Sequence, residues 1–373
     1  MLKTNSTPKV LVVASLGPRP YVGGIENVVD TLINSQLKEA FEFSVFDTYR
    51  TPDPNRTRIG KAVFAVSLFA RMTRKLQNFQ PDLVHIHFCS KIDFWKHTLC
   101  LVASRMHRTR VVFHLHGGSF DRFYEAKTPP IRALIRAIFR LPDAVVALSS
   151  YWQRFLTGLV DAKKINIINN PVDCVRLAPA VRKPGANRRP DILLLGSLGK
   201  RKGHYDSLGA LEIVLGTHPS ARLLFAGAEE DPGATVDLKR ICTERGLVDH
   251  VEFLGSLDFE HKLKVMHECA ALVLPSYAEN MPISVLEAMA AGTPVVASRV
   301  GAVPEALANG EAGCLIEAGD VRGLAEHIIS ILDNPERANE MAACAQRRAR
   351  ELWDVAQIAG RVGGLYRKVL RIS

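Results

Sequence analysis

The sequence lacks the features of fibrous, disulfide-rich and membrane-spanning proteins. Its seven cysteines occur singly, with no Cys-x-x-Cys pair, so neither a disulfide framework nor a cysteine-based zinc site is indicated. The longest nearly apolar runs, such as Ala62–Ala70, have about half of the ~20 residues that a membrane-spanning helix needs. The first residues pass from a short polar lead into an apolar run, without a signal-peptide pattern. We therefore expect a soluble, cytoplasmic protein.

Motifs for two common ligand classes are also missing. Aromatic residues make up only 7% of the chain and are hardly interleaved with basic ones, and no recognisable motif for binding RNA or DNA occurs. We therefore expect no nucleic-acid partner. Neither half of the chain has a Gly-x-Gly-x-x-Gly turn after its first apolar run with an acidic residue to follow, which disfavours a nicotinamide-dependent dehydrogenase.

Acidic residues are scarce in the first half of the chain only. Residues 1–180 contain 25 Lys and Arg against 13 Asp and Glu, a net charge of +12, whereas residues 181–373 have a net charge of −2. The stretch Arg56–Lys75 has no acidic residue and mixes apolar with basic positions at near-helical spacing. Such a helix can lie on an anionic membrane surface, where each basic group contributes on the order of 1 kcal/mol, or can simply expose a solvated cationic face. The sequence leaves both interpretations open.

Short apolar runs alternate with longer amphipathic segments along all 373 residues, which is typical of α/β domains with parallel sheets. The length is well beyond one comfortable core of ~150 residues, so two doubly wound, Rossmann-like domains are predicted. The expected strands are Val10–Ala14, Phe43–Asp47, Leu83–Phe88, Val111–Leu115, Ala144–Leu148 and Ile165–Ile168, followed by Ile192–Gly196, Leu223–Gly227, Val251–Leu254, Ala271–Pro275 and Pro294–Ser298.

A break in this alternation marks the domain boundary. The segment Ala178–Pro190 contains three prolines, a glycine and four basic residues, which suit an interdomain linker. It predicts a first domain over residues 1–180 and a second over 181–353. The helical stretch 354–373 either caps the second domain or crosses back to the first. Ligands of doubly wound sheets bind beyond the carboxyl ends of the strands, so the two facing edges are expected to form one cleft.

The segment Leu274–Gly301 has the clearest chemical pattern. A strand ends in a polar loop with Glu279, and a helix that begins near Pro282 carries Glu287 about one turn in. Two glutamates in this spacing could be ordinary surface residues, but the strand, loop and helix around them place them at the end of a sheet where ligands bind. Free amides at the start of the helix would attract an anion there. The candidate ligand residues of this loop and helix are Asn280, Met281, Pro282, Ile283 and Ser284.

A second candidate site is the basic turn Gly196–Gly203, directly after the first strand of the second domain. It is not a P-loop, because no Gly-x4-Gly-Lys-[Ser/Thr] can be read through it. It nevertheless places Lys200, Arg201 and Lys202 at the ligand edge of the sheet, where they suit a diphosphate. A merely solvated basic turn is the alternative.

Two pairs of histidines close strands of the first half. In His85-x-His87 and in His114-x-His116 the alternation of a strand puts both members on one face of the sheet. Two such pairs could hold a metal ion, but no Asp or Cys cluster nearby completes a ligand set, and strand histidines are usually satisfied core residues. We therefore expect no metal.

The motifs together resemble the retaining glycosyltransferases of family GT4, which have the two-domain GT-B fold. The spacing of Glu279 and Glu287 resembles the glutamate-x7-glutamate signature of that family. Four further segments agree in the expected order: Gly23–Glu26, Leu115–Gly118, Asn170–Asp173 (with proline for the family's glycine) and Pro304–Glu305. The resemblance covers essentially the whole chain.

The resemblance also implies roles for individual residues. Glu287 would hold the ribose of the nucleotide, Glu279 would face the transferred sugar, and His116 would lie near it. Gly23 and Gly24 would allow close approach of a ligand, although glycines of a tight turn are the alternative. Where family members carry an arginine, this sequence has Ser197, so the phosphate clamp would be rebuilt from Arg201 and Lys202.

The implied activity is transfer of a hexose-type sugar from a nucleotide sugar to a saccharide or lipid-linked saccharide, with retention of configuration and without a metal or other cofactor. Surface polysaccharide or glycolipid synthesis and a peripheral place on the inner face of the membrane follow from the same resemblance. Two alternatives stay open: a sugar-nucleotide epimerase of similar architecture, and a non-enzymatic protein that binds membranes or polyanions through its basic first half. The base of the nucleotide would be read by backbone near Gly227 and Leu254–Ser256.

Overall fold

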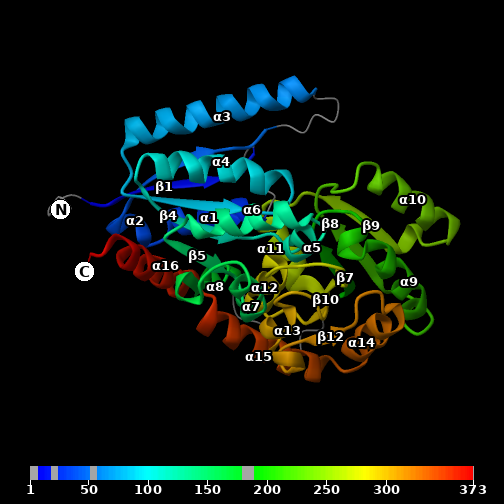
Figure 1. Ribbon diagram of the computed structural model, residues 1–373. Coiled ribbons are helices and arrows are strands. Elements are labelled where there is room, and N and C mark those ends of the chain that lie inside the picture. Colours follow the sequence, from blue (N-terminus) through cyan, green and yellow to red (C-terminus); the bar gives the residue numbers. More distant parts are fainter. Residues whose placement is uncertain (1–6, 18–23, 51–56, 179–188, 373) are drawn as a thin grey trace. The chain divides into compact units, whose positions relative to one another are not determined.

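The computed structural model describes residues 7–17, 24–50, 57–178 and 189–372 of the chain, and Figure 1 shows its ribbon. The chain forms two compact units. One comprises Met1–Pro171 together with Val355–Ser373, and the other comprises Val172–Asp354. Most of the expected linker, residues 179–188, lies outside the described residues, as do Gly23 and Arg56.

The first unit is built on a parallel sheet with the strand order β2-β1-β3-β4-β5-β6. Its strands are β1 (Lys9–Ala14), β2 (Glu42–Asp47), β3 (Leu83–Phe88), β4 (Arg110–Leu115), β5 (Ala144–Ala147) and β6 (Ile165–Ile167). All six were predicted from the apolar runs. β1 lies in the interior of the order, and consecutive strands are joined by helical crossovers, as in doubly wound sheets.

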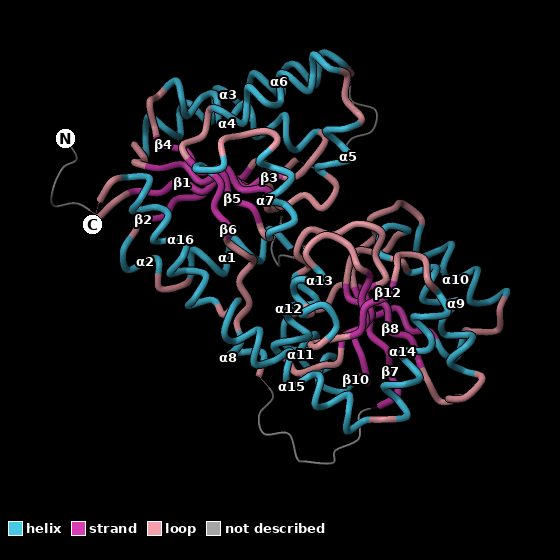
Figure 2. The backbone as a smooth tube through the Cα atoms, turned by 60° about the horizontal axis from the view of Figure 1, so that its bottom comes forward, coloured by secondary structure: helices cyan, strands magenta, loops and turns pink. Residues whose placement is uncertain are grey.

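Helices cover both faces of this sheet. They are α1 (Gly24–Asn34), α2 (Leu37–Ala40), α3 (Arg58–Phe79), α4 (Ile92–Met106), α5 (Phe120–Glu125), α6 (Pro129–Arg140), α7 (Ser150–Thr157) and α16 (Val355–Leu370). Figure 2 shows α3, α4 and α6 on one face and α1, α2 and α16 on the other.

Strand alternation decides which side chains meet which layer. Val84, Ile86 and Phe88 of β3 enter the apolar core with α3 and α4. The intervening histidines therefore point to the opposite face, toward α1 and α16. Tyr366 of α16 packs edge-on against Phe41 on that face, with ring centroids 5.3 Å apart. The last helix of the chain is thus part of the first unit.

The second unit repeats the architecture with the strand order β12-β11-β10-β7-β8-β9, all parallel. Its strands are β7 (Arg189–Leu195), β8 (Arg222–Ala226), β9 (Val251–Gly255), β10 (Cys269–Leu274), β11 (Val295–Ser298) and β12 (Cys314–Ile316). Five were predicted and β12 was not, because three residues on a sheet edge leave no period to read. The two parallel sheets confirm the predicted α/β class.

The helices of the second unit flank its sheet in the same way. They are α8 (Cys174–Leu177), α9 (His204–Leu215), α10 (Ala234–Glu244), α11 (Phe259–Glu268), α12 (Ile283–Ala290), α13 (Val303–Ala306), α14 (Val321–Asp333) and α15 (Pro335–Leu352). The segment after Pro171 is held in this unit, since the amide of Val172 donates to Trp353 O at 2.8 Å. Among the described helices, none is both long and apolar enough to span a bilayer.

Candidate active site

The loop after β10 buries Glu279 instead of exposing it. The side chain is only 7% exposed, and its Oε1 accepts a hydrogen bond from Lys202 Nζ at 2.6 Å, with Arg201 Nη1 3.6 Å away. Gly301 fixes this loop from the other side. It has a φ of +56°, and a Cβ there would lie 2.1 Å from Glu279 O, so only glycine fits. Glu279 is therefore held in a defined position beside two cations.

The basic turn meets Glu279 because a second glycine permits close approach. Residues Lys200–Lys202 form a single 3₁₀ turn, which ends at Gly203 with a φ of +77°. A Cβ on Gly203 would lie 2.2 Å from Pro275 O, so its absence lets the turn pack on the end of β10. The amide of Tyr277 then donates to Arg201 O at 2.8 Å. The structure thus brings together the two segments that sequence analysis treated separately.

Arg201 is held by a carboxylate that the sequence analysis missed. Its Nε and Nη2 donate to the two oxygens of Glu230 at 2.7 and 2.6 Å, while Nη1 donates to Ala278 O at 3.1 Å. Such a two-pronged pair is specific to the planar guanidinium. Ser197 lies half-buried at the start of the same loop, next to Leu198, whose amide donates to Ala228 O.

Glu287 also has a partner that was not predicted. Lys262 of α11 donates to Glu287 Oε1, and the two side chains are 15% and 12% exposed. Lys262 lies 25 residues earlier in the chain, in a segment without a recognisable motif. The pair fixes the carboxylate of Glu287 on the first turns of α12.

The start of α12 supplies amides that have no partner within the helix. The helix begins at Ile283 with Pro282 as its extended N-cap residue, close to the expected start near Pro282. Its first backbone hydrogen bond runs from Leu286 N to Pro282 O, so the amides of the preceding first-turn residues have no partner within the helix. Asn280 and Met281 are buried in the loop before it. Together with the helix dipole, these amides favour an anion.

Each of three cations in this part of the second unit has a carboxylate partner. Arg201 pairs with Glu230, Lys202 with Glu279 and Lys262 with Glu287, and Arg201 also lies 3.6 Å from Glu279. A diphosphate would add negative charge here and compete with the carboxylates for the cations.

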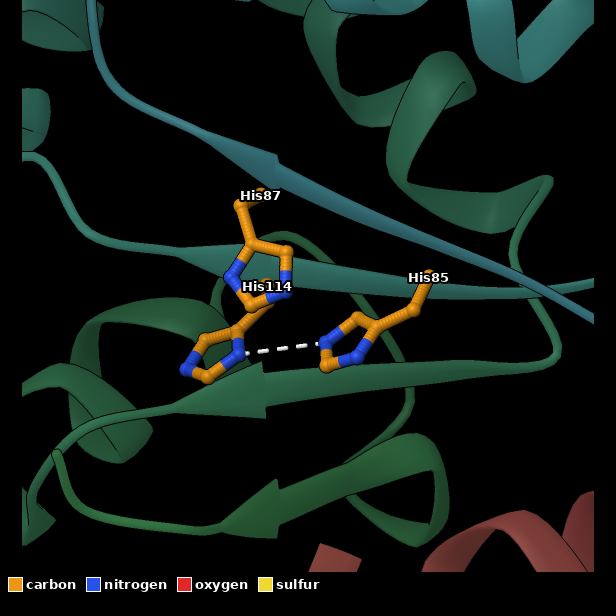
Figure 3. Close-up of side chains that lie close together, drawn as sticks. All are labelled: His85, His87 and His114. Atoms are coloured by element: carbon orange, nitrogen blue, oxygen red, sulfur yellow. Dashed lines mark hydrogen bonds between the residues drawn. The ribbon is translucent and has the colours of Figure 1, made fainter. Parts of the chain in front are cut away.

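In the first unit, His85, His87, His114 and His116 form a compact cluster, which we term the histidine ladder. His85 Nε2 and His114 Nδ1 are 3.2 Å apart, and Figure 3 shows this contact as a dashed line. His87 Nδ1 and His116 Nε2 are 2.8 Å apart. The rings of His114 and His116 have centroids 4.1 Å apart and are tilted by 33°. The ladder thus consists of two hydrogen-bonded pairs that pack against each other.

Burial keeps the histidine ladder neutral. It lowers the pKa of His85 and of His116 to about 3 and that of His87 and His114 well below the ordinary value. The lowered pKa of His116 favours its neutral imidazole form. Its backbone is fixed by a bond from His116 N to Phe88 O at 2.8 Å.

An acidic group lies close to the histidine ladder and was not predicted. Asp93 of α4 accepts from Cys89 N at 2.6 Å and lies 3.0 Å from Lys96 Nζ and 3.2 Å from His97 Nδ1. Burial alone would raise the pKa of Asp93, but His97 and these bonds lower it. Burial raises the pKa of Glu26 on α1, and the charge of Asp93 adds to that effect. Gly24 is the exposed first residue of α1.

Comparison with known proteins decides the family. The family model described as "Glycosyltransferase Family 4" matches residues 22–176, and the one described as "Glycosyl transferases group 1" matches residues 180–348. A D-inositol 3-phosphate glycosyltransferase from Corynebacterium efficiens is 32% identical over 310 residues, which are 76% of this chain and 70% of that protein. The chain belongs to glycosyltransferase family 4. A glycogen synthase from Mycobacterium tuberculosis is 28% identical over 314 residues, 83% of this chain and 74% of that protein.

The fold of this family 4 glycosyltransferase is similar to that of several solved structures. Sucrose-phosphate synthase from Thermosynechococcus elongatus superposes with a TM-score of 0.78 at 20% identity, over 98% of this chain and 100% of that chain. HepE from Anabaena, solved in complex with UDP-glucose, has a TM-score of 0.76 at 19% identity, over 96% and 99%. The predicted GT-B fold is confirmed.

Proposed function

We propose that this glycosyltransferase transfers a hexose from a nucleoside-diphosphate sugar to a saccharide or lipid-linked saccharide, with retention of anomeric configuration. The observation that carries the proposal is the Lys202–Glu279 pair, set beside Arg201 and the start of α12. HepE has been solved with UDP-glucose, and relatives are named as synthases or transferases of sugars, which supports a nucleotide sugar as donor.

Each site residue has a role in this scheme. Arg201 and Lys202 bind the diphosphate, helped by amides at the start of α12. Glu287, positioned by Lys262, binds the ribose hydroxyls. Glu279 stabilises the positive charge that develops on the sugar, and neutral His116 hydrogen-bonds to a sugar hydroxyl.

In the transfer step, the bond between the sugar's anomeric carbon and the diphosphate oxygen breaks, and a bond to the acceptor oxygen forms on the same face. The leaving diphosphate oxygen takes the acceptor's proton. Its negative charge is stabilised by fixed cations and amides, which need no reorganisation at the moment of reaction. The scheme requires no metal ion, so exhaustive treatment with a chelator should leave the turnover rate unchanged. A loss that added Mg²⁺ or Mn²⁺ restores would contradict it.

We place the acceptor reaction at the cytoplasmic face of the membrane, in surface polysaccharide or glycolipid synthesis. Helix α3 supports this: it has no acidic residue, and Ile59, Val63 and Val66 are between 61% and 77% exposed beside basic side chains. Helix α6 adds Arg132, Arg136 and Arg140 with a half-exposed Leu134.

Product analysis tests the proposed function. The protein is incubated with UDP-, GDP- and ADP-hexoses, each with and without simple saccharide and lipid-linked acceptors. Transfer predicts an acceptor-dependent product whose anomeric NMR coupling matches that of the donor. Conversion of the donor alone into an epimer would favour the epimerase. Binding without nucleotide preference that moderate salt abolishes would favour a polyanion-binding protein.

A further inference from the structure

The C-terminal helix α16 contributes one polar atom to the histidine ladder. The hydroxyl of Tyr366 lies 2.6 Å from His85 Nδ1, and the tyrosine side chain is fully buried. We propose that Tyr366 is a positioning residue, whose hydroxyl donates to His85 and thereby sets the tautomers of His85 and His114, the first pair of the histidine ladder, which packs against the second pair of His87 and His116. The link to His116 rests on the proposed function, whereas the tautomers can be observed without any substrate.

Two directions of hydrogen bonding are possible along Tyr366, His85 and His114. If Tyr366 donates to His85 Nδ1, the proton of neutral His85 is on Nε2 and is donated to His114 Nδ1. The Nε2–H of His114 then lacks a partner, and that nitrogen is indeed buried and unbonded among the described residues. One donor, this N–H, and one acceptor, the Tyr366 oxygen, are left unpaired among those residues.

The opposite direction is less favourable. His114 would donate to His85 and His85 to the tyrosine oxygen. The hydroxyl hydrogen of Tyr366 and the lone pair of His114 Nε2 would then both lack partners within the described part of the chain. Both directions leave one donor and one acceptor unpaired, so the strength of the bond at His85 decides between them. A phenol O–H is a stronger donor than an imidazole N–H, and an imidazole nitrogen is a stronger acceptor than a phenol oxygen, so the bond runs from Tyr366 to His85.

The same bond favours the neutral ladder. A hydroxyl that donates to His85 Nδ1 stabilises the neutral ring, because a protonated ring has no lone pair to accept it. The two pairs are coupled, since charge on His116 lowers the pKa of both His85 and His114. A proton on the first pair would therefore oppose one on His116. By keeping the first pair neutral, Tyr366 moves the first protonation of the histidine ladder, whichever ring takes it, to lower pH.

A metal ion is the competing occupant. His85, His87 and His114 each offer one ligand atom within 4.8 Å of the others. An ion between His85 Nε2 and His114 Nδ1 would take both lone pairs and leave the proton of His85 on Nδ1, donating to Tyr366. The two arrangements therefore predict opposite tautomers of His85: Nε2–H for the hydrogen-bonded ladder and Nδ1–H for a metal site.

Imidazole ¹⁵N NMR of the full-length protein, labelled at its twelve histidines, tests the proposal directly. Signals of His85 and His114 are assigned with His85→Gln and His114→Gln. We expect both residues to be Nε2–H tautomers in the wild type. In Tyr366→Phe this preference should disappear, because either direction then leaves one N–H and one lone pair unpaired. Tyr124→Phe, which removes a hydroxyl that accepts from the exposed Arg136, is the matched control and should change neither signal.

Three outcomes would overturn the proposal. These are an Nδ1–H tautomer of His85 in the wild type, tautomers unchanged in Tyr366→Phe, and stoichiometric Zn²⁺ binding that is lost in His85→Gln. Turnover tests the link to His116: Tyr366→Phe should move the acid limb of the kcat profile upward by about half a pH unit or more, with the donor KM unchanged. An unmoved limb would refute that link. A wild type without transfer would refute the proposed function and leave the NMR result standing.

Discussion

At the scale of single residues, the site depends on carboxylates placed beside cations. Glu279 is nearly fully buried and is held by Lys202. A buried carboxylate that faces a developing cation stabilises the transition state far more than the bound donor. The informative variant is therefore one that removes the charge of Glu279 and keeps the shape of its side chain.

Glu279→Gln should lower kcat about 100-fold or more, the range found when one electrostatic stabiliser is removed, with donor affinity changed only a few-fold. Steady-state kinetics and calorimetric titration of the donor separate the two effects. Glu317→Gln, an exposed glutamate near Arg299, is the control and should match the wild type. Unchanged turnover in Glu279→Gln would remove Glu279 from the mechanism.

Glu230 forms an ion pair with the guanidinium of Arg201, to which the diphosphate is expected to bind. Glu230→Gln should therefore strengthen the binding of UDP or GDP by roughly fivefold, since a part-exposed ion pair contributes up to about 1 kcal/mol. Titration calorimetry of wild type and variant measures this. Weaker binding in the variant would instead mean that Glu230 serves only to orient Arg201.

The site residues could be predicted from the sequence, but their partners could not. Glu279, Glu287 and Lys202 belong to local motifs. In the structure, Lys202 pairs with Glu279, and Glu287 pairs with Lys262. Glu230 lies 29 residues from Arg201, and Tyr366 lies 281 residues from His85. No local period links such positions, because only the packing of separate strands and helices brings them together.

At the scale of elements, the exposed side of α3 has the composition of a membrane-binding helix. It is 22 residues long, capped by Thr57, whose side chain accepts from Gly60 N, and buries Leu68, Met72 and Leu76 on one side. The other side exposes apolar and basic groups together. That pattern suits the interface of an anionic bilayer.

Reversing the charges of Arg71, Arg74 and Lys75 should weaken binding to vesicles that contain anionic lipid by at least tenfold, given about 1 kcal/mol for each basic group. Vesicle co-sedimentation at fixed salt measures it. The matched control reverses Arg337, Arg347 and Arg350, which are exposed on α15. Equal loss in both variants, or none in either, would leave α3 a solvated helix.

Regular elements were largely predictable because buried strands leave continuous apolar runs. Eleven of twelve strands lie where these runs do, and the exception is the three-residue edge strand β12. The start of α12 was expected near Pro282, and the helix begins at Ile283 with Pro282 as its N-cap residue. Such ends depend on backbone angles that the sequence leaves open.

At the scale of the whole molecule, the sequence pattern of the last helix did not show which unit the helix belongs to. An amphipathic helix of this length can cap either unit, and the buried bond from Tyr366 to His85 places α16 in the first. The first unit therefore contains both ends of the described chain.

The histidine ladder should make the first unit sensitive to acid. Its four pKa values are lowered by folding, so the unfolded chain binds protons first, and the free energy of unfolding falls as the pH drops below about 6.5. The slope approaches ~1.4 kcal/mol per pH unit for each histidine. Denaturant unfolding at pH 7 and pH 5 measures the loss, which should be smaller in His114→Gln. A loss of the same size in that variant would contradict the account.

The central claim is that the second unit holds a nucleoside diphosphate between Arg201, Lys202 and Glu287. A thermal-shift panel of UDP, GDP, ADP, their hexose conjugates, NAD and inorganic diphosphate tests it most directly. At ~100 times its dissociation constant, the true ligand should add about 2.7 kcal/mol of stability. We expect a shift with one nucleoside diphosphate that is lost in Glu287→Ala and kept in the exposed control Glu260→Ala. A shift that survives Glu287→Ala, or equal shifts with every anion, would contradict it.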